Sequence, residues 1–280
     1  MRIWDCESGR YEETMSGHTK GVNGIDFRPG SGDLMASCSS DMSIKLWPFG
    51  VEYEQQKRER GGSSGARTSV RTLMGHDHTV SCVKFVPPRG DQLVSTSRDG
   101  TIKVWDIETG YCVLTMVGHE GWVRQASVLD EETIATAGQD KTVRLWSLSS
   151  GENTGTLCGH ENVVECVAFA QKDGRPVVLS GSRDKTIRVW SLETRACEAV
   201  LEGHENWVRA LYVVPSNPRF VVSVGDDKAI LCWDLNELRC VKTIKDAHSS
   251  FVTAVSLCKL HGHFATGGAD SVVKVWDTSI

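Results

Sequence analysis

The sequence has no apolar run approaching the roughly 20 residues that span a bilayer, no cysteine pair spaced CxxC, and no strong excess of charge of either sign. Its first ten residues, MRIWDCESGR, lack the apolar core of a signal peptide. The formal net charge of -5 gives no global reason to expect nucleic acid or an anionic membrane as the main partner. These absences favour a cytosolic or nuclear chain.

Cysteine is present, but in a pattern that points away from disulfide or metal chemistry. Cys112, Cys197 and Cys240 each follow a strand-ending tryptophan by seven residues, and Cys82 and Cys166 each follow a Gly-His histidine by six. Recurrence at fixed positions without CxxC pairs is typical of small, reduced thiols buried in strands. We therefore expect no metal site and no cofactor.

Tryptophan marks an internal repeat. Seven of the nine tryptophans end runs such as IKVWD at spacings of 41 to 58 residues, namely Trp4, Trp47, Trp105, Trp146, Trp190, Trp233 and Trp276. A period of about 40 to 45 residues with Gly-His and Trp-Asp marks is typical of WD-repeat propeller blades. Short alternating strands such as VNGIDF (22–27) agree with four-stranded sheets. The predicted fold is all-β, a single WD-repeat β-propeller over residues 1–280.

Six repeats also carry one set of four residues at a fixed register. An aspartate lies six residues before the tryptophan, a hydroxyl lies four before the aspartate, and a histidine lies 21 to 24 before the aspartate. We expect the aspartate to hold the imidazole, the imidazole to meet the hydroxyl, and the hydroxyl to reach the indole N–H. A catalytic Ser-His-Asp triad is the alternative, but an enzyme needs only one such set. The predicted structural tetrads are His18, Ser37, Asp41, Trp47; His76, Ser95, Asp99, Trp105; His119, Thr136, Asp140, Trp146; His160, Ser180, Asp184, Trp190; His204, Ser223, Asp227, Trp233; and His248, Thr266, Asp270, Trp276.

The repeat breaks in two places. Residues 1–16 hold only the end of a first unit, which fits a seven-blade propeller with a truncated first blade, from a fragment or a misplaced start. The alternative is a six-blade ring closed by residues 11–16 acting as the missing strand. Residues 51–68, VEYEQQKRERGGSSGART, lengthen one interval by about 15 residues. Their charge and Gly/Ser content predict a flexible inserted surface loop.

One end of the predicted blades carries the residues that vary between repeats. Because the histidine and aspartate of a tetrad must touch, the turns that hold them share this end. Cations and aromatics gather there in the last five repeats, at Arg98, Trp122, Arg124, Arg183, Trp207, Arg209, Lys228 and Phe251. Arg and Trp often dominate interface energetics, so we predict a basic and aromatic protein-binding face. The alternatives are tryptophans that only cover the central channel, or a nucleic-acid site, which the net charge disfavours.

Several segments resemble one WD-repeat family in particular. They include STSRDGTIKVWDIETGYCV (95–113), VVECVAF (163–169) and GHENWVR (203–209). Together they are similar to the propeller of the lissencephaly protein family, also called the nuclear distribution protein or the non-catalytic subunit of brain platelet-activating factor acetylhydrolase. The resemblance runs over essentially the whole chain. It implies binding to the motor domain of cytoplasmic dynein through Arg98, Arg124, Arg183, Trp207 and Lys228, with Trp122, Arg209 and Phe251 as possible additions to the face.

The resemblance implies a non-enzymatic regulator of cytoplasmic dynein that controls microtubule attachment, nuclear migration and mitotic transport. The implied location is the cytoplasm, at microtubules or the centrosome. Further implied partners are nuclear-distribution adaptor proteins and acetylhydrolase catalytic subunits, with no nucleic acid and no membrane insertion. The family's LisH motif and coiled coil are absent from this sequence. The alternative function is a generic WD-repeat interaction scaffold, such as a ubiquitin-ligase substrate receptor or the regulatory subunit of a lipid-ester hydrolase.

Overall fold

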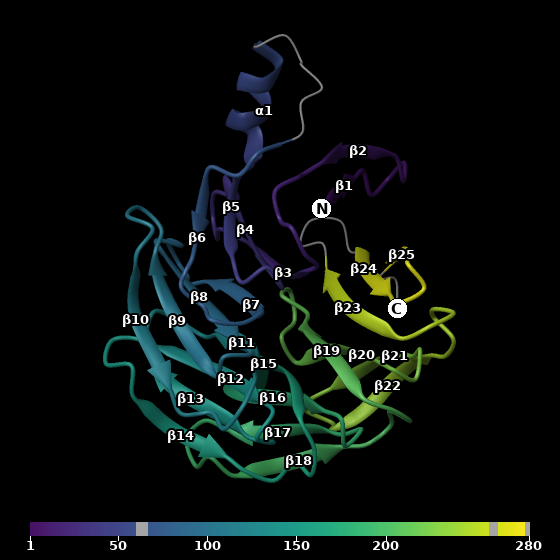
Figure 1. Cartoon of the computed structure of the whole chain (residues 1–280). Coiled ribbons are helices and arrows are strands. Elements are labelled where there is room, and N and C mark those ends of the chain that lie inside the picture. The colour runs from purple at the N-terminus through teal and green to yellow at the C-terminus, as the bar shows by residue number, and fades with distance from the viewer. Residues whose placement is uncertain (60–66, 258–262, 278–280) are drawn as a thin grey trace. The chain divides into compact units, whose positions relative to one another are not determined.

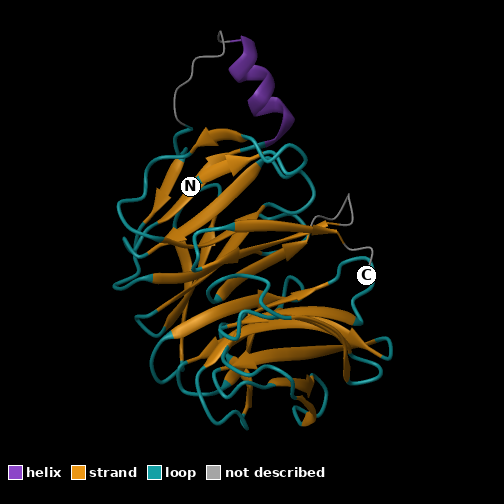
Figure 2. Ribbon diagram, turned by 90° about the vertical axis from the view of Figure 1, so that its right-hand side faces the viewer, coloured by secondary structure: helices purple, strands orange, loops and turns teal. Residues whose placement is uncertain are grey.

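A computed structural model describes residues 1–59, 67–257 and 263–277. The chain divides into two compact units, the first comprising Met1–Thr133 with Ser147–Glu152 and the second comprising Ile134–Trp146 with Asn153–Ile280. Figures 1 and 2 show strands throughout both units and a single helix in the described part of the chain. The all-β prediction is therefore confirmed.

The first unit contains two complete four-stranded sheets and one two-stranded sheet. The complete sheets have the orders β3-β4-β5-β6 and β10-β9-β8-β7, and the small sheet pairs β1 with β2. Their strands are β1 (Arg2–Trp4), β2 (Tyr11–Thr14), β3 (Val22–Phe27), β4 (Leu34–Ser39), β5 (Ile44–Pro48), β6 (Arg71–Leu73), β7 (Val80–Phe85), β8 (Gln92–Ser97), β9 (Thr101–Asp106) and β10 (Cys112–Val117), and β11 (Val123–Val128) follows them in the same unit.

The second unit repeats this plan. Its complete sheets have the orders β15-β16-β17-β18 and β19-β20-β21-β22, a three-stranded sheet has the order β23-β24-β25, and β13 pairs with β14. The strands are β12 (Thr133–Gly138), β13 (Val143–Ser147), β14 (Asn153–Leu157), β15 (Val164–Lys172), β16 (Arg175–Ser182), β17 (Ile187–Ser191), β18 (Cys197–Leu201), β19 (Val208–Val213), β20 (Phe220–Gly225), β21 (Ile230–Asp234), β22 (Arg239–Ile244), β23 (Val252–Leu257), β24 (His263–Gly268) and β25 (Val273–Asp277).

The second strand of each complete sheet lies at the centre of its core. In β8, every residue from Leu93 to Ser97 is buried, and β4, β16 and β20 follow the same pattern. The tryptophan that ends the third strand is also fully buried in five repeats, at Trp47, Trp105, Trp146, Trp190 and Trp233. Burial of a large apolar side chain contributes on the order of 2 kcal/mol or more to stability. The strand-ending tryptophans therefore anchor the repeat, as their spacing predicts.

Trp4 departs from that pattern. It ends β1 as the other tryptophans end theirs, but it is 51% exposed and packs edge-to-face against Tyr11, with ring centroids 5.6 Å apart. Residues Tyr11–Thr14 pair antiparallel with β1, and the Met1 carbonyl accepts a bond of 2.9 Å from the Met15 amide. In the described chain, Tyr11–Thr14 therefore form a small sheet with β1. The alternative in which residues 11–16 supply the missing strand of the last blade stays a prediction, because that blade belongs to the other unit.

The predicted flexible loop over 51–68 is also wrong for much of its length. Residues Gly50–Glu59 form helix α1, which projects from the sheets of the first unit in Figures 1 and 2. Residues 60–66 lie outside the described residues. Arg67 then returns to the body of the unit with its side chain only 2% exposed, and its guanidinium donates to Glu13 at 2.8 Å and to the Pro48 carbonyl at 2.9 Å.

Arg67 also lies over two aromatic rings, with its guanidinium carbon 4.4 Å from the ring centres of both Phe49 and Tyr53. Arg67 is therefore a buried charge, although it lies in a segment predicted to be a surface loop. A buried guanidinium is tolerated there because a carboxylate, a carbonyl and two aromatic faces replace water.

The cysteines follow the sequence prediction only in part. Cys82 and Cys166 are buried, and burial raises the pKa of both thiols. Cys112 and Cys197, in contrast, are exposed at the start of outer strands. In the described part of the chain, no group of His, Cys, Asp and Glu is arranged to hold a metal ion. Nor does that part contain a helix long and apolar enough to cross a membrane.

Candidate partner-binding face

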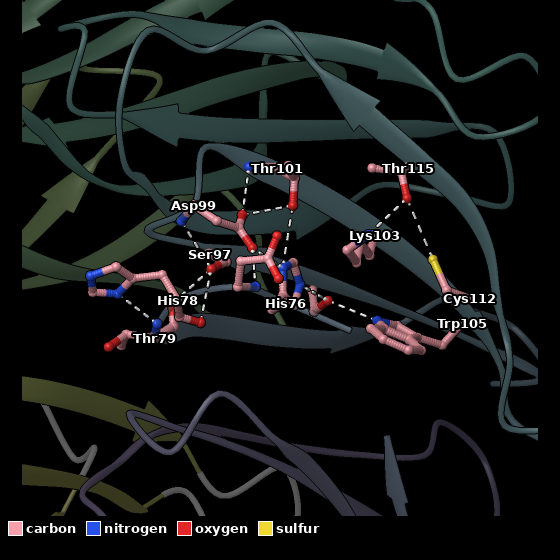
Figure 3. A network of polar contacts seen from close by, with 12 residues as sticks. His76, His78, Thr79, Ser97, Asp99, Thr101, Lys103, Trp105, Cys112 and Thr115 are labelled. Atoms are coloured by element: carbon pink, nitrogen blue, oxygen red, sulfur yellow. Dashed lines mark hydrogen bonds and ion pairs between the residues drawn. The ribbon is translucent and has the colours of Figure 1, made fainter. Parts of the chain in front are cut away.

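The tetrad of the sheet β7 to β10 shows how the repeats are held (Figure 3). His76 Nδ1 lies 2.8 Å from Asp99 Oδ2, His76 Nε2 lies 2.7 Å from Ser95 Oγ, and Trp105 Nε1 donates to Ser95 Oγ at 2.8 Å. An ionised carboxylate only accepts, so Nδ1 must donate to Asp99. In the neutral imidazole Nε2 then accepts the Ser95 proton, and Ser95 accepts the indole N–H. The buried hydroxyl thereby donates one hydrogen bond and accepts another.

The same contacts recur in the other repeats. The histidine Nδ1 lies 2.7 to 3.1 Å from the aspartate and Nε2 lies 2.6 to 2.8 Å from the hydroxyl in the tetrads of His18, His160, His204 and His248. Their tryptophans donate to the hydroxyl at 2.7 to 2.8 Å. In the remaining repeat, Trp146 Nε1 donates to Thr136 Oγ1 at 2.8 Å, and His119 belongs to the other unit.

Two further donors, which the sequence pattern missed, hold the tetrad aspartate. Thr101 Oγ1 donates to Asp99 Oδ1 at 2.7 Å, and the Asp77 amide donates to Asp99 Oδ2 at 3.0 Å. Burial disfavours the charged form of Asp99, but the bonds from His76 and Thr101 outweigh it and hold its pKa well below the ordinary 3.8. A hydroxyl two residues after the aspartate, present at Ser43, Thr101, Thr142 and Thr186, was the signal available in the sequence.

In five repeats of the described chain, a backbone hydrogen bond joins the histidine loop to the aspartate turn. The amide just before the aspartate donates to the carbonyl three residues after the histidine, as in Arg98 to Thr79 at 3.0 Å, Arg183 to Val163 at 3.0 Å and Asp226 to Trp207 at 2.9 Å. The variable positions flanking these tetrads therefore lie side by side at one end of their sheets.

A β-bulge aims a further side chain at this end. The pairing of the first and second strands skips one residue between Val80 and Cys82, between Val164 and Cys166, and between Val208 and Ala210. The skipped residues are Ser81, Glu165 and Arg209. A bulge re-aims the extra residue and locally increases strand twist, so the fifth residue after each of these histidines reaches the same end as the loops.

In the first unit, this arrangement gathers three of the predicted face residues. The guanidinium carbons of Arg98 and Arg124 lie 4.4 and 5.0 Å from the ring centre of Trp122. We call this group the first cluster. Arg98 comes from one repeat, whereas Trp122 and Arg124 come from the next. Cation–π contacts of this kind contribute about 0.5 to 1 kcal/mol at exposed sites.

In the second unit, the same positions form a matching group. The guanidinium carbons of Arg183 and Arg209 lie 4.1 and 4.7 Å from the ring centre of Trp207. We call this group the second cluster. The arginines that contact Trp122 and those that contact Trp207 occupy equivalent positions in their repeats. The sequence spacing predicts that these residues share one end of the sheets, but it does not predict the contacts between them.

The second cluster also contains two carboxylates that are not among the predicted face residues. Arg183 Nε lies 2.5 Å from Glu165 Oε1, and Arg209 donates to both oxygens of Asp226 at 2.6 and 2.7 Å. Bonding to Asp226 raises the pKa of Arg209, although burial opposes the change. The expectation of a basic face therefore needs correction here, because Glu165 and Asp226 balance the charges of the two arginines.

The last two predicted face residues, Lys228 and Phe251, follow the second cluster in sequence. Lys228 lies in the turn after Asp227 with a φ of 64°, and its amide donates to the Gly225 carbonyl at 3.2 Å. Phe251 is 44% exposed, and its carbonyl accepts the Ala269 amide at 2.8 Å. Both residues are thus at the histidine–aspartate end of their own sheets, as the register predicts.

Comparison with known proteins identifies the class. Residues 9–48, 67–106, 110–147 and 238–277 match the family model of the WD domain, G-beta repeat, and so cover more than half of the chain. The chain therefore belongs to the WD40 repeat family, whose fold is the all-β propeller. Residues 152–253 match the model of the tRNA methyltransferase TRM82 WD40 domain.

Within that class, the chain is similar to fungal nuclear distribution proteins. It is 47% identical to nuclear distribution protein PAC1 of Arthroderma otae over 132 residues, which is 44% of this chain and 26% of that protein. It is 38% identical to nuclear distribution protein nudF of Aspergillus niger over 172 residues, which is 61% of this chain and 36% of that protein. The matched region thus spans about a quarter to a third of the length of these relatives.

Proposed function

We propose that this chain is a non-enzymatic regulator of cytoplasmic dynein that binds the motor domain through the end of the sheets carrying the two clusters. The observation that carries the proposal is the paired occurrence of Arg–Trp–Arg contacts at one register, on a framework similar to nuclear distribution proteins. Binding that is tighter to one motor conformation than to another would shift the motor toward that conformation.

The physical character of the clusters supports a role in protein binding. Trp122 and Trp207 are neither buried in a core nor fully exposed, and each lies beneath two guanidinium groups. Such side chains lose little conformational freedom when a partner covers them, which favours tight association. The tetrad hydroxyls do not offer a competing catalytic site, because each described hydroxyl accepts an indole N–H within a core.

The wider biological role follows from the same proposal. A motor regulator of this kind would control microtubule attachment, nuclear migration and mitotic transport from the cytoplasm, at microtubules or the centrosome. Nuclear-distribution adaptor proteins and acetylhydrolase catalytic subunits are the further partners that we propose for the remaining surface. Arg98, Arg124, Arg183, Trp207 and Lys228 are the proposed contacts, with Trp122, Arg209 and Phe251 as additions.

The test is binding of the full chain to a purified cytoplasmic dynein motor domain, measured as a dissociation constant. Trp207→Ala should weaken binding by about tenfold or more, because it removes an aromatic contact and the stacking surface of two arginines. Arg183→Ala should have a similar effect.

The matched control is Arg239→Ala. Arg239 is an exposed arginine that begins β22, at the opposite end of its sheet from Trp207, and its guanidinium pairs with the nearby Glu237. This variant should bind like the parent. Absence of binding by the parent chain, or equal binding by Trp207→Ala, would refute the proposal.

A further inference from the structure

The two clusters share one construction but differ in their charged neighbours. In the second cluster, the fifth residue after the fourth repeat's histidine is Glu165, and the residue before the fifth repeat's tetrad aspartate is Asp226. The equivalent positions for the first cluster hold Ser81 and Gln139, which carry no charge. The substitution of two carboxylates is therefore the main chemical difference between two otherwise matching groups.

The carboxylates of the second cluster are placed to hold its arginines. Glu165 Oε1 lies 2.5 Å from Arg183 Nε and 3.8 Å from Arg209 Nη1, so one oxygen is close to both guanidinium groups. Asp226 makes a two-point contact with the Nε and Nη2 of Arg209. The Glu165 and Asp226 side chains are 9% and 6% exposed, so both pairs are shielded from competing water.

Two guanidinium groups over one indole repel each other, and carboxylates bonded to both offset that repulsion. A two-point Arg–carboxylate contact also fixes the plane of the guanidinium, which a single charge would not do. The second cluster is consequently ordered and close to neutral, counting Arg183, Arg209, Glu165 and Asp226. In contrast, the first cluster has no carboxylate at the two equivalent positions.

We propose that Glu165 and Asp226 are positioning residues that set the specificity of the second cluster. They keep Arg183 and Arg209 over Trp207 and cancel their charge, so that this cluster contacts apolar surface and uncharged hydrogen-bond acceptors, such as backbone carbonyls, on the partner. This inference rests on the proposed function for the identity of the partner, but not for the ordering of Trp207 in the free chain.

The proposal predicts an effect opposite in sign to that of simple electrostatics. If Glu165 and Asp226 acted only as negative charges, their removal would strengthen binding to an acidic partner surface. If they position the arginines, their removal releases Arg183 and Arg209 from Trp207 and weakens binding. Glu165→Gln and Asp226→Asn keep side-chain size almost unchanged and remove only the charge.

The first experiment uses the free chain labelled with 5-fluorotryptophan and observed by fluorine NMR. Trp207→Phe and Trp122→Phe variants identify the two resonances. In the Glu165→Gln, Asp226→Asn double variant, the Trp207 resonance should move toward that of a solvent-exposed tryptophan, while the Trp122 resonance stays in place. An unmoved Trp207 resonance in a chain that still unfolds cooperatively would overturn the inference.

The second experiment measures binding of the same variants to the dynein motor domain. Glu165→Gln and Asp226→Asn should each weaken binding by about tenfold, comparable to the loss of one charge-assisted hydrogen bond. Glu205→Gln is the matched control, because Glu205 lies on the histidine loop that carries Trp207 and its side chain is 77% exposed beside Lys245. It removes the same charge without touching the cluster and should not weaken binding.

The two experiments separate the two possible failures. If the parent chain does not bind the motor domain, the proposed function fails, and the fluorine spectrum alone decides whether Glu165 and Asp226 position Trp207. If the parent binds and Glu165→Gln or Asp226→Asn strengthens binding, the specificity inference is overturned while the proposed function stands.

Discussion

The first and second clusters are built on the same framework but are not equivalent in charge. Each consists of an arginine from one repeat and a Trp-x-Arg segment from the next. Equivalent backbone bonds place Arg98 and Arg183, and a bulge places Arg209. The two clusters differ at two register positions. These positions hold Glu165 and Asp226 for the second cluster, and Ser81 and Gln139 for the first. Repetition therefore determines where the side chains lie, and individual neighbours determine which chemistry they offer.

The tetrads beneath the two clusters should contribute equally to stability, and their removal is the largest effect that we expect. Asp99 in the first unit and Asp184 in the second are mostly buried, and both have a pKa well below the ordinary 3.8 despite the opposing effect of burial. Asp99→Asn and Asp184→Asn should each lower the free energy of unfolding by about 2 kcal/mol at neutral pH. Denaturant titration measures this loss.

Acid should remove the same contribution from the parent chain. Because the folded pKa of each aspartate is lowered, its stabilisation is complete above the unfolded value near 3.8 and is lost as pH falls toward the folded pKa. The stability difference between the parent and either variant should therefore shrink below about pH 4. If the stability loss shrank in acid for only one of the two variants, the tetrads beneath the two clusters would not be equivalent.

A smaller effect on stability should distinguish the clusters themselves. Arg183 and Arg98 occupy equivalent positions. The Nε of Arg183 bonds to the mostly buried carboxylate of Glu165, whereas the position equivalent to Glu165 beside Arg98 in the register holds Ser81. Arg183→Met should lower the free energy of unfolding by about 1.5 kcal/mol, because Glu165 loses its closest partner. Arg98→Met should cost less than half as much. Thermal unfolding measures both losses. If Arg183→Met and Arg98→Met cost the same, the bond from Arg183 to Glu165 adds nothing to the stability that the cation–π contact supplies.

Much of this architecture could be predicted from the sequence because it repeats. The spacing of tryptophan, aspartate, hydroxyl and histidine predicted the sheets and the contacts of His76 with Asp99 and Ser95. The shared register also predicted that Trp207 and Arg183 lie at one end of their sheets. Periodic features are predictable because a hydrogen-bonded core imposes the same residue types on every copy.

Features that occur once were missed, for definite physical reasons. Glu165 and Asp226 were visible at face positions, but their pairing depends on a bulge and on neighbouring strands, which the register alone does not reveal. Helix α1 was taken for a loop because of its charge, although Glu, Gln, Lys and Arg also favour helices. Trp4 lacks the covering strands that bury its counterparts, so its position in the repeat did not predict its exposure.

The contacts of Arg67 have a consequence for how this protein can vary. Helix α1 starts directly after β5, and Arg67 ties the far end of the insertion to Glu13 and to the end of β5. The two ends of the segment from Gly50 to Arg67 therefore both lie at the end of β5. Doubling the length of a closed loop costs only about 0.6 kcal/mol in chain entropy. We therefore expect this site to accept an inserted reporter or an additional recognition sequence with little change in the stability of the repeats.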